Sequence, residues 1–75
     1  MSDEFRTYVV KLVDGHAVLL GRFIGTTPEV YRNKTWEYWP PLVAYLEGNM
    51  PWLVEVHESE VPRYMEMIDN RPRLR

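Results

Sequence analysis

The 75 residues have room for one small domain, and the lack of cysteine excludes disulfide bonds and thiolate metal sites. A hydrophobic content of 45%, with three Trp, five Tyr and two Phe, is too high for a disordered chain. The net charge of −2 provides no general attraction to nucleic-acid phosphates.

The compartment is inferred from features that the sequence lacks. Its acidic start, Met1-Ser2-Asp3-Glu4, differs from the cationic and apolar regions of a signal peptide. No apolar run approaches the ~20 residues needed to cross a bilayer. We therefore expect one soluble, cytoplasmic domain over residues 1–75, without membrane contact.

The first predicted element is a β-hairpin made of residues 5–13 and 16–24. Both segments are rich in β-branched and aromatic residues, and Asp14-Gly15 between them is a strong signal for a two-residue turn. Such a turn places Val13 opposite His16. A three-residue turn would change the cross-strand partners.

The two-residue turn sorts the hairpin side chains onto two faces. The face expected to form the core carries an apolar set: Tyr8, Val10, Leu12, Ala17, Leu19 and Phe23. The opposite face, which includes Val9, Val18 and Leu20, is mixed but still markedly apolar. It is expected to be covered by a second layer or to be a docking surface.

Helices are predicted between the hairpin and the next strand. Thr26-Thr27-Pro28-Glu29 has the cap residue, the proline and the acidic first turn of a helix start. Pro40-Pro41 ends that element. A kinked helix or a helix-loop-helix therefore fits residues 28–47, closed by Gly48-Asn49.

A third strand and a final helix complete the predicted order. Residues 52–57 alternate, with Trp52, Val54 and Val56 on the side expected to be buried. Ser59 is expected to cap a helix with an apolar stripe formed by Val61, Tyr64, Met65 and Ile68. Residues 71–75, with Arg71, Arg73 and Arg75, are expected to form a mobile basic tail.

Together these elements predict an α+β fold of order β-β-α-(α)-β-α. Two or three short helices are expected to pack on a small three-stranded sheet. The spacing leaves open which hairpin strand pairs with the third strand.

The sequence contains no recognisable catalytic set. Its two histidines, His16 and His57, have too few companions at the right spacing for a zinc site. Ser59 is better explained as a helix cap than as a nucleophile, and the glycines build no phosphate loop. We expect no enzymatic activity, no metal and no cofactor.

Aromatic residues and charge distribution are the most informative features for function. Six large aromatic residues fall within residues 31–52, and residues 37–60 carry five glutamates without a lysine or arginine. Because Trp and Arg are frequent anchors of protein interfaces, the partner-contact candidates combine them with the outer hairpin face. These candidates are Trp36, Trp39, Arg32, Lys34, Val9, Val18 and Leu20. The alternative for Trp36 and Trp39 is that their rings fill the core.

We therefore expect a protein-interaction module, a small regulator or inhibitor that binds a larger protein. Small acidic chains of this kind are common among phage-encoded modulators, which makes host machinery a candidate target. One alternative is nucleic-acid binding through Arg22, Arg32, Lys34 and the basic tail. The other is a structural homodimer that buries the outer hairpin face.

Overall fold

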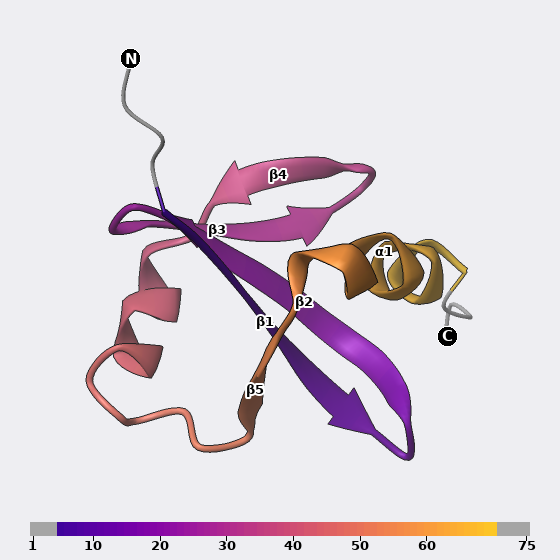
Figure 1. Cartoon of the computed structure of the whole chain (residues 1–75), viewed down its shortest axis with the longest axis horizontal. Coiled ribbons are helices and arrows are strands. Elements are labelled where there is room, and N and C mark those ends of the chain that lie inside the picture. Colours follow the sequence, from indigo (N-terminus) through magenta and orange to yellow (C-terminus); the bar gives the residue numbers. More distant parts are fainter. Residues whose placement is uncertain (1–4, 71–75) are drawn as a thin grey trace.

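The computed structural model describes residues 5–70 and shows five antiparallel strands in one sheet, followed by a short α-helix (Figure 1). The order across the sheet is β4-β3-β2-β1-β5. The strands are β1 (Arg6–Val13), β2 (His16–Ile24), β3 (Thr27–Arg32), β4 (Thr35–Tyr38) and β5 (Leu53–Val56). The 3-10 helices η1 and η2 span Pro40–Tyr45 and Glu58–Glu60, and α1 spans Val61–Asp69.

This architecture corrects the predicted three-stranded sheet with two or three helices. The segment expected to begin a helix after Gly25 is instead the hairpin β3–β4. Its turn residues Asn33 and Lys34 have φ values of 55° and 64°, the left-handed conformation of a type I′ turn. β-branched and aromatic side chains pack well on a sheet, and here that preference outweighs the helix-start signal.

The proline in that signal is accommodated within β3. Pro28 pairs with Phe23 of β2, and its carbonyl accepts a hydrogen bond of 3.0 Å from the Trp39 N–H. Within residues 28–47, where helices were expected, only Pro40–Tyr45 is helical, as the 3-10 helix η1.

The first predicted hairpin is confirmed. Val13 pairs with His16, and Asp14 and Gly15 have φ values of 54° and 81°. The strand expected within residues 52–57 is also present as β5, which pairs with β1. The C-terminal helix begins at Val61 instead of Ser59.

The cap of this last segment differs from the prediction. The His57 Nδ1 accepts a hydrogen bond of 3.0 Å from the Ser59 N–H, at the start of η2. No side chain caps α1 itself. Histidine thus performs the local capping that the sequence assigned to serine.

A β-bulge in β2 redistributes the hairpin side chains. Lys11 pairs with Leu19 but Leu12 pairs with Ala17, so Val18 is an extra residue on β2. Because side chains alternate along a strand, one extra residue reverses the faces beyond it. Leu20 therefore lies on the same face as Tyr8, while Leu19 and Phe23 lie on the other.

Both faces of the sheet carry a hydrophobic cluster. Between α1 and the sheet, the buried members are Tyr8, Val10, Ala17, Leu20, Tyr31, Val61 and Tyr64. On the η1 side they are Val9, Phe23, Leu42 and Leu53. Figure 1 shows α1 and η1 on opposite sides of β1 and β2. A second layer thus covers the outer hairpin face.

No helix within residues 5–70 combines the length and apolar character needed to cross a membrane. The predicted basic tail, residues 71–75, lies outside the described part of the chain.

Candidate functional site

Trp36, a predicted contact residue, is part of a cluster on the α1 face of the sheet. Its ring centroid lies 6.1 Å from that of Tyr8 and 5.4 Å from that of Tyr31. The Arg22 guanidinium lies 4.2 Å from the centroid of the Trp36 ring, and its Nε donates to Glu29 at 2.7 Å. These contacts hold the half-buried indole in place and give it a structural role.

Two other predicted contact residues are withdrawn from the surface, and a third is partly buried. Val9 and Leu20 have no exposed side-chain area, which follows from the covering of both sheet faces. Trp39 is partly buried against the cluster around Leu42. In the folded chain Val9 and Leu20 are therefore unable to touch a partner.

The predicted basic contact residues lie at the β3–β4 hairpin. Arg32 is exposed, and its Nε lies 3.6 Å from the Glu37 carboxylate on the neighbouring strand. Lys34 is exposed in the turn. Arg22 is a separate case, because it is half-buried and paired with Glu29. Of these three described residues, Arg32 and Lys34 share a hairpin, whereas Arg22 is held apart in its ion pair.

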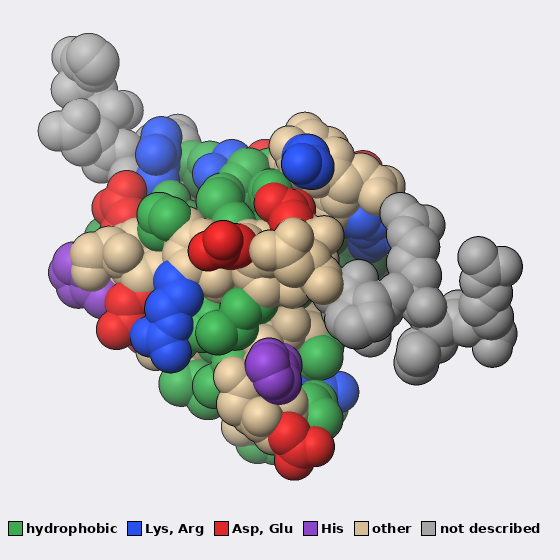
Figure 2. Space-filling model, turned by 90° about the vertical axis from the view of Figure 1, so that its right-hand side faces the viewer, with side chains coloured by type: hydrophobic (Ala, Val, Ile, Leu, Met, Phe, Trp, Pro, Cys, Tyr) green, Lys and Arg blue, Asp and Glu red, His purple; other side chains and the backbone are tan. Residues whose placement is uncertain are grey.

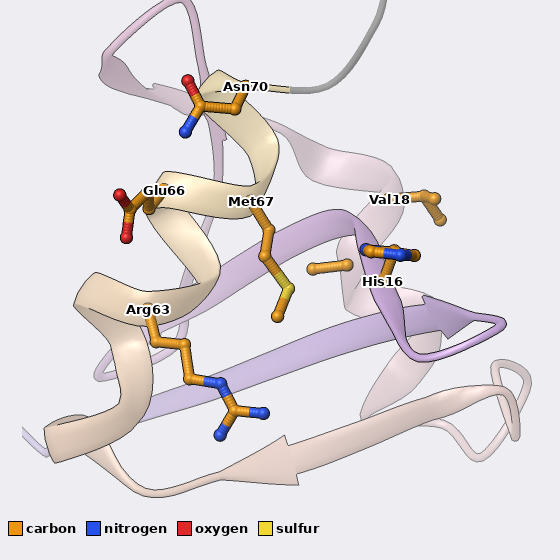
Figure 3. A pocket seen from close by; sticks show the side chains of 7 residues that line it. His16, Val18, Arg63, Glu66, Met67 and Asn70 are labelled. Carbon is orange, nitrogen blue, oxygen red and sulfur yellow. The ribbon is translucent and has the colours of Figure 1, made fainter.

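A groove lies between α1 and the beginning of β2 (Figure 3). Its volume is about 540 Å³, and it is lined by His16, Ala17, Val18, Arg63, Glu66, Met67 and Asn70. In Figure 3, Met67 and Arg63 point from the helix toward the strands, while Glu66 and Asn70 point outward at the rim. We call this the α1 groove; its mainly apolar interior suits hydrophobic side chains better than a charged ligand.

Large hydrophobic side chains are exposed beside this groove. Leu12 and Val54 are 41% and 51% exposed, and each pairs with a buried residue of the α1-side cluster, which places them on that face. Trp52, 53% exposed, lies in the turn that leads directly into β5. We call Leu12, Trp52 and Val54 the apolar strip.

Figure 2 views the molecule from the side of α1 and the hairpin turn, and shows hydrophobic side chains reaching the surface there. Sequence reasoning missed this surface because it assigned Trp52 and Val54 to a buried face. The strand is present as β5, but its buried side chain is Leu53, at 6% exposure, and not Val54. A signal was present in Trp52 itself, a frequent interface anchor next to a short strand.

One histidine and one serine with potentially reactive side chains lie close together in the described part of the chain. The His57 Nδ1 and the Ser59 Oγ lie 2.8 Å apart, but both are exposed and belong to the η2 cap. Within residues 5–70, no group of three potential ligands is placed to hold a metal ion. Searches against protein-family models, curated proteins and solved structures find no match for this chain.

Proposed function

We propose that this protein is a non-enzymatic interaction module that binds a larger protein and regulates or inhibits it by covering part of its surface. The observation that supports this proposal is the apolar strip beside the α1 groove. Contiguous exposed apolar surface often marks an interaction site. Here it occurs in a small chain that needs its hydrophobic residues for the core.

The composition of this surface suits a protein partner. Trp52 provides a large ring that buries much area at low entropic cost, and the α1 groove can accept a side chain of the partner. Glu58 and Glu60 follow the strip along the chain and are exposed. Their charge opposes phosphate groups, so this surface favours a protein over a nucleic acid.

The test is affinity capture with matched variants, at low and high salt, after nuclease treatment. Trp52→Ala removes the largest side chain of the strip. Leu46→Ala is its control, because Leu46 is 56% exposed but follows η1, away from the strip. We expect a protein that remains bound at high salt to the wild type and to Leu46→Ala, and is lost with Trp52→Ala.

Two other results would contradict this proposal and support an alternative function. Recovery that disappears with nuclease or falls steeply with salt would indicate nucleic-acid binding. Concentration-dependent dimerisation abolished by Trp52→Ala, with no other protein bound, would indicate that the strip joins two copies of the chain.

A further inference from the structure

We infer that the outer edge of β5 is where the partner adds an extended, basic segment as a sixth strand of the sheet. The inference rests on the proposed function and specifies how the partner binds next to the apolar strip. β5 ends the strand order of the described sheet, so one side of its backbone has no neighbouring strand. Such an edge is a template for a peptide strand.

The strand register identifies the backbone groups on that edge. The Phe5 carbonyl accepts from Gly25 N–H, so the odd residues of β1 direct their backbone groups toward β2. Tyr8 and Val10 then bond to β5, through Val56 and Val54. Glu55, between these two, directs its N–H and C=O away from the sheet.

Leu53 fits the same alternation. Its N–H does not reach β1 but donates to the Met50 carbonyl at 3.1 Å. Its C=O faces outward with the two backbone groups of Glu55. The edge thus presents one donor and two acceptors within three residues, enough to align a short extended peptide.

Side chains next to this edge indicate the kind of segment that fits. Val54 pairs with Val10 and lies on the α1 face together with Leu12, while Glu55 pairs with Val9 and projects from the opposite face. A bound strand whose residues alternate between apolar and basic would therefore meet Val54 with one set and Glu55 with the other. Glu58 and Glu60 follow and add to the negative charge.

The other edge of the sheet lacks this combination. At β4, the Arg32 and Glu37 side chains lie 3.6 Å apart, so their charges compensate each other. Pairing of β5 with β5 of a second copy is also unfavourable, because it would bring two glutamate-rich segments together. The β5 edge thus favours a basic partner segment over the same chain.

The probe is a synthetic peptide alternating Lys and Val, titrated into the whole protein and followed by Trp fluorescence and backbone amide shifts. A Glu and Val peptide of equal length is the charge control. Two N-methylated versions of the Lys and Val peptide complete the set. One is methylated on the lysine amides and the other on the valine amides. Strand pairing uses only the amides that face the β5 edge. Only the peptide methylated on those amides should therefore lose binding.

Variants of Glu55 test the same edge from the protein side. Glu55→Pro removes an N–H that the β1–β5 ladder does not use, and proline is tolerated at such positions. Glu55→Gln keeps the N–H and removes the charge. We expect Glu55→Pro to weaken binding about tenfold or more, and Glu55→Gln to weaken it less.

The expected result is saturable binding of the Lys and Val peptide, with shifts centred on Glu55 and with weaker binding of the Glu and Val peptide. Absence of saturable binding, or equal effects of the two N-methylated peptides, would overturn the inference. If a captured partner is lost with Trp52→Ala but retained by Glu55→Pro, the proposed function stands and strand addition fails. If no protein is captured, the proposed function itself fails.

Discussion

A Cβ atom added to Gly21 would lie 2.8 Å from the Leu42 Cδ2, closer than real Cβ atoms come to other carbon atoms. The close approach of the Leu42 side chain, and not an unusual backbone conformation, favours glycine at this position of β2. Leu42 is fully buried and is the side chain with which η1 closes the second face of the sheet. The Gly21–Leu42 contact therefore joins the sheet to its outer layer.

Gly21→Ala should destabilise the protein by about 1–3 kcal/mol, because the added methyl group overpacks the contact with Leu42. Chemical denaturation followed by circular dichroism measures this change. Thr35→Ala, at an exposed position of β4, is a control with a small expected effect. Wild-type stability in Gly21→Ala would mean that η1 can move away from the sheet at little cost.

Trp36→Ala should destabilise the fold by about 3 kcal/mol, since it empties the space between Tyr8, Tyr31 and the Arg22 guanidinium. That is a large fraction of the stability of a small domain. Trp36→Phe retains an aromatic ring and should lose less. Thermal unfolding distinguishes this structural role from a contact role, in which Trp36→Ala would weaken partner binding at unchanged stability.

Local signals in the sequence were sufficient for part of the fold. Asp14-Gly15 defines its hairpin through the backbone angles of two adjacent residues, and β5 shows a clear alternation. Both features depend on a few neighbouring residues. The hairpin of β3 and β4 had a weaker signal, because its turn is Asn33-Lys34 without glycine. In addition, Thr27 and Pro28 match the residue pattern of a helix start.

Non-local contacts determined what the sequence left open. The bulge at Val18 depends on how β2 pairs with β1, and it decides whether Leu20 faces α1 or η1. Period-two alternation also separates two faces without saying which is covered. For that reason the exposure of Trp52, and with it the candidate surface, emerged only from the tertiary structure.

Lys34→Gly should stabilise the protein by about 0.5 kcal/mol. Lys34 has a φ of 64°, a conformation that costs an L-residue free energy and that glycine adopts without strain. Part of the gain is offset by the greater freedom of glycine in the unfolded chain. The midpoint of urea unfolding reports the change, and Asn33→Gly should gain less because asparagine tolerates this region. A lower midpoint for Lys34→Gly would show that the lysine side chain has a stabilising contact.

The Tyr31–Asp69 contact should make stability sensitive to alkaline pH. Burial, and then the hydrogen bonds of 3.1 Å to the Asp69 carboxylate and its charge, raise the pKa of the Tyr31 phenol above its ordinary value of 10.0. Since the unfolded chain ionises first, this contribution is complete below about pH 10 and decreases as pH rises through the folded-state pKa.

Tyr31→Phe isolates this effect because it keeps the ring and removes the ionising group. At neutral pH we expect it to lose about 1 kcal/mol with the hydrogen bond. The difference in unfolding free energy between wild type and Tyr31→Phe should narrow as the pH rises above about 10. Contributions of the other tyrosines cancel in that difference. If this difference in unfolding free energy stayed constant across the pH range, Tyr31 would have the same pKa in the folded and unfolded chains. That result would contradict the effect expected from its contact with the Asp69 carboxylate.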